Sequence, residues 1–403
     1  MKTINTKIPL AIWAIGFASM LLNISTAMVF GVIALYMMQI MGSSTGFIFM
    51  LEGFFEAMAF AMKLLSGLVS DYLRRPKKVM TIGFAMVTIA KPMFALFATV
   101  PTVIIARLLD RFGNGMQSTP RDALVGDLAP KDIKGSCFGL RNAMAQAGSF
   151  IGAGLGFISM YSFELSYQQL FMWASFPASI GFLLLLIFVH DPHEKELTAD
   201  KKPIRHPLHL SDLVRLGKSY WLLMIVVLVF MSSRVGESML ALHAIQSFGM
   251  DKNFAHAIVI LYNATNSLFS YPVGMLSDKL GRFGFLALSF VILILADVLL
   301  GFSSNLWVML IGVGLWGIQI GMSQDMFLCM IADKVPQDLR GTAIGFYYII
   351  NAVGLLMAGF VGGSLADKYD QFVTFIGSGS IALLALILLL IMRPSIDKSI
   401  TKN

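Results

Sequence analysis

The sequence has little charge. Charged residues make up 13% of the 403-residue chain and hydrophobic residues 57%. A soluble domain carries about 25% charged residues and about 45–50% apolar ones. A soluble chain of this length would show charged faces along amphipathic helices. The scarcity of charge therefore argues strongly against a soluble globular protein.

Cysteine and several catalytic motifs are also scarce or absent. Both cysteines, Cys137 and Cys329, fall near the cytoplasmic ends of predicted membrane spans, so no disulfide framework is expected. The chain holds no Walker phosphate-binding loop and no His-Glu-x-x-His zinc motif. We therefore predict that it is not an enzyme and that it binds no cofactor and no metal.

What the sequence does contain is a succession of long apolar runs between Ile8 and Met392. Each run is about 20 residues or longer, enough for a helix to cross a hydrocarbon core ~30 Å thick. We predict an all-α membrane protein with twelve transmembrane helices, near residues 8–40, 46–69, 79–98, 103–128, 136–160, 168–190, 219–241, 253–275, 284–302, 306–332, 341–364 and 372–392.

Two motifs occur twice at the same spacing. The pattern Asp-x-x-Pro-x-Asp-x-[Lys/Arg]-Gly-x-x-x-Gly begins at Asp127 and again at Asp333, 206 positions later. The pattern Gly-x-x-Ser-Asp begins at Gly67 and again at Gly274, 207 positions later. One offset of about half the chain indicates a duplicated unit. We predict two pseudo-symmetric six-helix bundles, residues 1–190 and 219–403, joined by a cytoplasmic linker at 191–218.

The net charge of +7 reflects topology. Lys and Arg gather in the loops that would share one side of the membrane, whereas the opposite loops hold only Lys252 and Lys368. Positively charged loops mark the cytoplasmic side. We expect a multi-pass protein of the cytoplasmic (inner) membrane with both termini in the cytoplasm, a lipid bilayer as its surroundings, and no nucleic-acid partner.

Six spans plus six, a central linker and a repeated Gly-x-x-Ser-Asp loop resemble the major facilitator superfamily of secondary transporters over essentially the whole chain. In that family the loop after the second span of each half reads roughly G-x-L-[AS]-D-[RK]-x-G-R-[RK]. The copy that starts at Gly274 fits well, whereas the copy that starts at Gly67 has Tyr72 at a basic position and lacks the second glycine.

A carboxylate at a helix end can hold backbone N–H groups or a basic side chain, and such a latch favours one of two packings. The alternative is a plain short turn with positively charged flanks. We expect a gating role for Gly67, Asp71, Arg75, Asp127, Gly274, Asp278, Arg282 and Asp333.

The fourth predicted span carries a polar stripe. Its members lie three and four residues apart, on one helical face that extends ~21 Å, and they are Arg107, Arg111, Asn114, Ser118 and Arg121. A charge at the bilayer centre costs at least ~2.5–3.5 kcal/mol, so the stripe must face a water-filled cavity or partner helices. The alternative is a structural ion-pair network, in which Asp110 and Asp122 neutralise neighbouring arginines.

The family resemblance extends to this stripe. Arg111-Phe-Gly-Asn-Gly115 resembles the family's R-x-x-[QN]-G signature, in which the arginine is implicated in proton coupling or substrate contact. Residues 118–124 resemble a bacterial subgroup with an R-T-x-P-R-D-A-L pattern, and Arg141 fits that subgroup as well. On the fifth span, glycines 148, 152, 154 and 156 resemble the family's antiporter signature, but Ala153 replaces its proline, which weakens the assignment as a drug:proton antiporter specifically.

Two further spans carry charge. Glu56 lies deep in the second span and is our first candidate for the proton site, and Arg234 and Glu237 are expected to pair on the seventh. Lys91 and Asp297 are interpreted as structural or interfacial. The candidates for proton or substrate binding are Glu56, Arg107, Asp110, Arg111, Arg121, Asp122, Arg141, Arg234 and Glu237.

These features predict a secondary active transporter that works by alternating access between two halves. We expect it to be a proton-coupled monomer and to move a small organic solute that is anionic, zwitterionic or amphipathic. Efflux and uptake both fit the sequence. The alternative is a non-transporting membrane sensor or a lipid-handling protein on the same scaffold.

Overall fold

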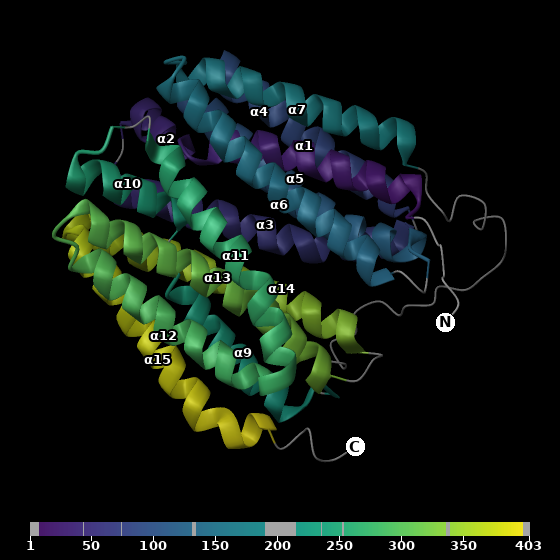
Figure 1. Cartoon of the computed structure of the whole chain (residues 1–403), viewed down its shortest axis with the longest axis vertical. Coiled ribbons are helices and arrows are strands. Elements are labelled where there is room, and N and C mark those ends of the chain that lie inside the picture. Colours follow the sequence, from purple (N-terminus) through teal and green to yellow (C-terminus); the bar gives the residue numbers. More distant parts are fainter. Residues whose placement is uncertain are drawn as a thin grey trace. The chain divides into compact units, whose positions relative to one another are not determined.

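The computed structural model describes residues 8–42, 44–73, 75–130, 134–189, 215–234, 236–251, 254–335 and 339–397. Within these ranges the regular secondary structure is helical (Figure 1). The helices are α1 Leu10–Phe30, α2 Ile33–Met41, α3 Thr45–Leu73, α4 Pro76–Leu96, α5 Val100–Leu128, α6 Lys134–Tyr161, α7 Tyr167–Phe188, α9 Gly217–Ser232, α10 Glu237–Phe248, α11 Ala255–Leu280, α12 Arg282–Gly301, α13 Leu306–Lys334, α14 Arg340–Lys368 and α15 Gln371–Asp397.

Each predicted span corresponds to a helix or to a pair of helices. Within the described ranges, eight helices are long and apolar enough to cross a membrane. Their outward-facing side chains are often large and apolar, as a lipid-facing surface requires. Examples are Ile89, Ile311 and Ile391, which are 55%, 58% and 71% exposed.

Two predicted spans are not continuous helices, which corrects the sequence prediction. The run 8–40 breaks at Gly31 and Val32, between α1 and α2. The run 219–241 breaks between Ser232, the last residue of α9, and Glu237, the first of α10. Ser232 Oγ donates to the Leu228 carbonyl at 2.8 Å, and Ser233 Oγ donates to the Phe230 carbonyl at 2.7 Å. Serine hydroxyls that bond back to the preceding turn favour a bend in a helix.

The chain forms two compact units. Unit 1 comprises Met1–Gly31 and Ala61–Pro207, and unit 2 comprises Val32–Phe60 and Leu208–Asn403. The division falls inside α3, so α2 and the first part of α3 belong with unit 2. The division into two repeated halves, residues 1–190 and 219–403, with a linker at 191–218, stays a prediction.

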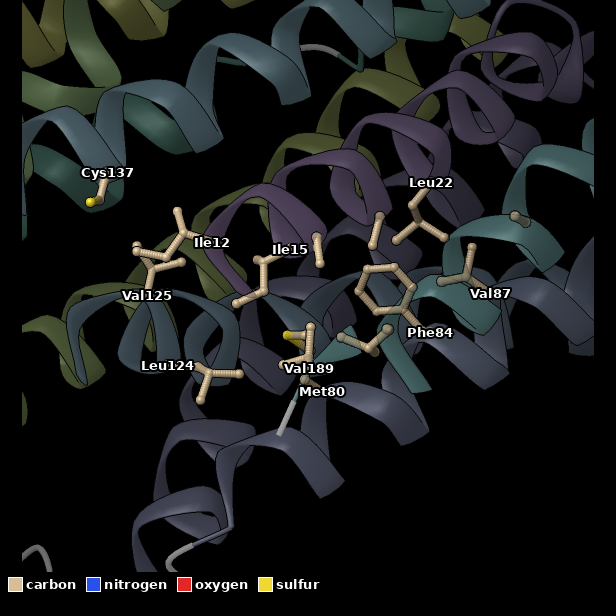
Figure 2. Packing of buried hydrophobic residues seen from close by; sticks show 14 residues of the cluster. Ile12, Ile15, Leu22, Met80, Phe84, Val87, Leu124, Val125, Cys137 and Val189 are labelled. Atoms are coloured by element: carbon tan, nitrogen blue, oxygen red, sulfur yellow. The ribbon is translucent and has the colours of Figure 1, made fainter. Parts of the chain in front are cut away.

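The core of unit 1 is apolar. Helix α1 packs on α6 and α7, and α4 packs on α5 and α7. Figure 2 shows Phe84 and Val87 of α4 near Ile15 and Leu22 of α1 in one buried cluster. These side chains are at most 2% exposed, so helices that could each lie in lipid are fixed to one another by packing.

The core of unit 2 is aromatic. The rings of Phe230 in α9 and Phe290 in α12 stack with their centroids 4.0 Å apart, and Phe327 of α13 lies 5.7 Å from Phe230. Helix α12 also packs along α13 and α15. This packing holds the end of α9, where the seventh span breaks, against three neighbouring helices.

Two glycines let α4 and α5 approach closely. A Cβ atom on Gly113 would lie 2.5 Å from the carbonyl oxygen of Gly83 and 2.7 Å from a methyl of Val87. A Cβ atom on Gly83 would lie 2.8 Å from the carbonyl oxygen of Gly113. Small residues of this kind permit backbone contact between membrane helices. The contact brings the charged faces of α4 and α5 within reach of each other.

Replacement of Gly113 by Ala is expected to destabilise the protein by about 1–3 kcal/mol, because the new methyl group meets backbone that cannot move aside. Gly154→Ala in α6 is the matched control, since nothing lies within 4 Å of a Cβ atom there. That change should be neutral or stabilising by up to about 1 kcal/mol. Thermal unfolding of the purified variants in detergent measures both effects. Equal unfolding temperatures for the two variants would contradict the close contact.

Candidate functional site

Unit 1 contains a buried ionic cluster on α4 and α5. Lys91 Nζ lies 2.6 Å from Asp110 Oδ1, and Arg111 Nη2 lies 2.7 Å from Asp110 Oδ2. Arg107 Nη1 lies 3.4 Å from the same Oδ2 atom. The four side chains are between 0% and 9% exposed. One carboxylate is therefore shared by three cations, in surroundings where a charge must be paired.

The structure thus brings together three predicted site residues, Arg107, Asp110 and Arg111. It adds Lys91, which the sequence identified only as structural or interfacial. The contacts fit the ion-pair alternative for this part of the stripe, because Asp110 bonds to three cationic side chains at once. A role of these residues in proton or substrate binding stays a prediction.

A second ionic group lies on α5 and α6. Asp122 Oδ1 accepts from Arg141 Nη2 at 2.7 Å and from Arg121 Nε at 3.2 Å. Arg121 also donates to Gln117 Oε1 at 3.1 Å. The Asp122 side chain is 45% exposed, in contrast to the 1% of Asp110. This pair is therefore screened by solvent, and the two ends of the polar stripe lie in different surroundings.

Unit 2 gathers a different set of polar groups where the seventh span breaks. Arg234 follows the end of α9, and its guanidinium carbon lies 5.7 Å from the ring centroid of Trp316 in α13. Tyr262 of α11 donates a 2.7 Å hydrogen bond to Glu237 Oε1 at the start of α10. The rings of Tyr262 and Trp316 have their centroids 5.8 Å apart.

Glu56 of α3 lies in the same unit and is close enough to Tyr262 to interact with it electrostatically. The charges of three predicted site residues from distant parts of the sequence, Glu56, Arg234 and Glu237, therefore act on one tyrosine. The sequence did not single out Tyr262. The signal that could have identified it is its position next to Asn263, the counterpart of Glu56 at the repeat offset.

Some polar atoms of this group have no hydrogen-bond partner among the described residues. Arg234 Nε and Trp316 Nε1 are buried and unbonded. The polar contact of Arg234 is with the Met231 sulfur, 3.8 Å from Nη1, and it has no carboxylate within ion-pair distance in the described ranges. A buried donor without an acceptor is costly, so this group is suited to receive an acceptor from a ligand.

The predicted gating residues are described only in part. Gly67 packs against Thr119 of α5, and Thr119 Oγ1 donates to the Lys63 carbonyl at 2.7 Å. Arg75 precedes α4, Arg282 begins α12 and Asp127 is exposed near the end of α5. Gly274 lies within α11, and the side chains of Asp71, Asp278 and Asp333 are outside the part that the structure describes, so the gating role stays a prediction.

Asp367 forms the kind of contact that was expected for the gating carboxylates, namely a carboxylate bonded to a backbone N–H group at a helix end. Its carboxylate accepts from Gly46 N at 2.9 Å and from Ser44 Oγ at 2.7 Å, and so it caps the first turn of α3 from α14. Asp367 was not among the residues predicted from the sequence. Its signal was a third Gly-x-x-[Ala/Ser]-Asp pattern, from Gly363 to Asp367, at the end of the eleventh span.

Comparison with known proteins identifies the class. The sequence profile of the Major Facilitator Superfamily matches residues 15–243 and again residues 222–403. The chain belongs to this family of membrane transporters. It is therefore a multi-pass membrane protein with two six-helix halves and a secondary transporter, not an enzyme.

Two relatives match nearly the whole chain. One is described as an uncharacterized MFS-type transporter of Methanocaldococcus jannaschii and is 26% identical over 385 residues, 94% of each chain. The other is the quinolone resistance protein NorA of Staphylococcus aureus, which is 21% identical over 391 residues, 95% of this chain and 96% of that one.

Solved structures show the same fold. A POT family transporter in complex with 5-aminolevulinic acid has a TM-score of 0.80 at 14% identity and covers 96% of this chain and 97% of its own. The nucleoside transporter NupG has a TM-score of 0.75 at 18% identity and covers 96% of this chain and 99% of its own.

Loss of the Asp110 carboxylate should destabilise the protein more than loss of any one cation that binds it. Asp110→Asn leaves Lys91, Arg107 and Arg111 close together without their shared anion, at an expected cost of about 3–5 kcal/mol. Lys91→Met leaves Asp110 bonded to Arg111 and should cost less. Asp122→Asn is the solvent-exposed control, with an expected cost of about 1 kcal/mol or less. Thermal unfolding in detergent ranks the three variants, and a larger loss for Asp122→Asn than for Asp110→Asn would contradict this interpretation.

Proposed function

We propose that this transporter exports a small organic solute that carries a carboxylate on an apolar, aromatic body, and that protons drive the transport. The observation that carries the proposal is Arg234, a cation stacked on Trp316 with no carboxylate partner in the described part of the chain. By contrast, the Lys and Arg side chains of unit 1 whose contacts are described above each form an ion pair with a carboxylate.

The chemistry of Arg234 fits a carboxylate ligand. A guanidinium presents its N–H groups in a planar fork that matches two carboxylate oxygens. Its Nε donor is buried and unbonded. A ligand that supplied two oxygens would satisfy this donor and neutralise the charge at the same time.

The neighbouring aromatic side chains fit an apolar body. Arg234 lies over the ring of Trp316, and the ring of Tyr262 has its centroid 5.8 Å from that of Trp316. Aromatic faces of this kind stack with planar ligands. A quinolone, whose fused aromatic ring carries a carboxylate, has this combination, and one relative is a quinolone resistance protein.

The helix breaks support a binding site near Arg234. The first span of each half is interrupted, at Gly31–Val32 in one and between Ser232 and Glu237 in the other. Interrupted spans at corresponding positions of two repeats are the best sequence-level indication of a transporter's binding site. Arg234 lies within the second of these interruptions.

We assign the coupling proton to Glu56. Glu237 accepts the hydrogen bond of the Tyr262 hydroxyl, and the charge of Glu56 acts on the same tyrosine. Departure of the anionic solute from Arg234 changes the local charge, and uptake or release of that proton compensates for the change.

Transport in proteoliposomes tests the substrate assignment. Arg234→Gln should raise the apparent KM for a quinolone about 10-fold to 100-fold, which corresponds to the loss of a charged hydrogen bond worth about 1.5–3 kcal/mol. Arg393→Gln is the matched control, because Arg393 also lies over an aromatic ring, 4.9 Å from the centroid of Phe283, but outside this group. An unchanged KM in Arg234→Gln would overturn the assignment. pH gradients of opposite sign give the direction, and export requires solute movement against the proton flow.

Proton coupling has its own test. In Glu56→Gln, an imposed pH gradient should no longer drive quinolone accumulation, whereas exchange of solute at equal pH on both sides should continue. The measurement is substrate-dependent proton flux beside radiolabelled exchange in the same vesicles. Proton flux that equals the wild-type value would make Glu56 structural and leave the coupling site to another carboxylate.

A further inference from the structure

Unit 2 contains a buried carboxyl group that takes no part in the site described above. Asp297 of α12 is 0% exposed, and its Oδ1 atom has no hydrogen-bond partner in the described ranges. Its Oδ2 atom lies 2.7 Å from Ser378 Oγ of α15. Among the described residues no Lys, Arg or His forms an ion pair with it. A carboxylate in such a position would be a buried charge without a counter-charge.

The hydrogen-bond pattern gives the protonation state. Ser378 Oγ also hydrogen-bonds to the carbonyl oxygen of Ser233. A hydroxyl has one hydrogen, and a carbonyl oxygen can only accept. Donation of that hydrogen to Ser233 leaves Ser378 to accept from Asp297. That second bond requires a proton on Oδ2, as in a carboxylic acid.

The Ser233 carbonyl lies at the point where the seventh span breaks. Ser233 follows the last residue of α9, and the backbone N–H of Arg234 bonds back to the Met231 carbonyl at 3.2 Å. The last carbonyls of a helix lack partners within the helix and need one from elsewhere. Ser378 supplies the partner for Ser233, one residue before Arg234.

We propose that Asp297 is a second proton-binding site of this chain, and that its proton holds the break between α9 and α10 in the arrangement described here. When Asp297 releases its proton to water, the hydrogen of Ser378 turns to the new carboxylate. The Ser233 carbonyl then has no partner, and the break opens because a buried acceptor without a donor is costly. Arg234 moves away from Trp316 as a result.

The charged groups around Asp297 are compatible with this switch. Arg234 follows the end of α9, one residue after Ser233, and lies over the ring of Trp316. From α10, His243 bonds to Gln371 of α15 and to Ser303 just after α12. Gln371 lies about two turns from Ser378 along α15, and Ser303 lies about two turns from Asp297 along α12. Neither forms an ion pair with Asp297, so the proton is held by the Asp297–Ser378–Ser233 chain itself.

This proposal does not depend on the identity of the solute or on Glu56. Infrared spectroscopy of the lipid-reconstituted protein, without substrate, tests the protonation state directly. At neutral pH the wild type should show a protonated-carboxyl stretch that Asp297→Asn lacks, and Ser378→Ala should shift this band by removing its hydrogen bond. Ser380→Ala, on an exposed position of the same helix, should leave the band unchanged. A wild-type minus Asp297→Asn difference that shows only ionised-carboxylate bands would overturn the proposal.

A second measurement tests the link to the helix break. Gly236, the exposed residue before α10, is replaced by Cys in a chain that also carries Cys137→Ala and Cys329→Ala. The alkylation rate of this chain is compared with that of the same chain carrying Asp297→Asn. Above the pH at which the acid band disappears, the ratio of the two rates should rise roughly fivefold or more. A fivefold ratio corresponds to about 1 kcal/mol. A ratio that stays at one while the band disappears would show that Asp297 does not hold the break.

Discussion

Hydrocarbon offers no partner to a polar group, so each charge or carbonyl removed from water must find its partner inside the protein. Unit 1 meets this requirement with ions. The close approach of α4 and α5 at Gly83 and Gly113 places Lys91 2.6 Å from Asp110, and Arg107 and Arg111 share the same carboxylate. A network with this many charged contacts resists rearrangement, because removal of one partner leaves others buried and unpaired.

Unit 2 meets the same requirement mostly with neutral groups and aromatic faces. Arg234 lies on Trp316, Tyr262 donates to Glu237, and Asp297 is neutralised by its own proton. Such contacts involve fewer opposed charges, and they change when a ligand or a proton arrives or leaves. The difference between the units explains why we assign solute and proton binding to unit 2, although unit 1 carries the most conspicuous charges of the sequence.

Much of the fold and part of the site could be predicted from the sequence. The spans followed from the length of the apolar runs, and the stripe from Arg107 to Arg121 followed from steps of three and four residues. The break after Ser232 was not predicted, because the run 219–241 has the length of one continuous span. The role of Asp367 depends on a helix more than 300 residues away in the sequence, and repeat spacing does not reveal that contact.

The sequence by itself determined the class of the protein. Twenty-residue apolar runs can only be membrane helices, and one offset shared by two motifs can only be a duplication; both follow from local composition and counting. Only the tertiary structure decided which charges are paired. Lys91 and Asp110 are 19 positions apart, and Glu56, Arg234 and Tyr262 are spread over three helices or their ends. Whether a buried group is held by an ion, a hydroxyl or a ring depends on distances of a few ångströms between helices, and helix packing alone fixes these.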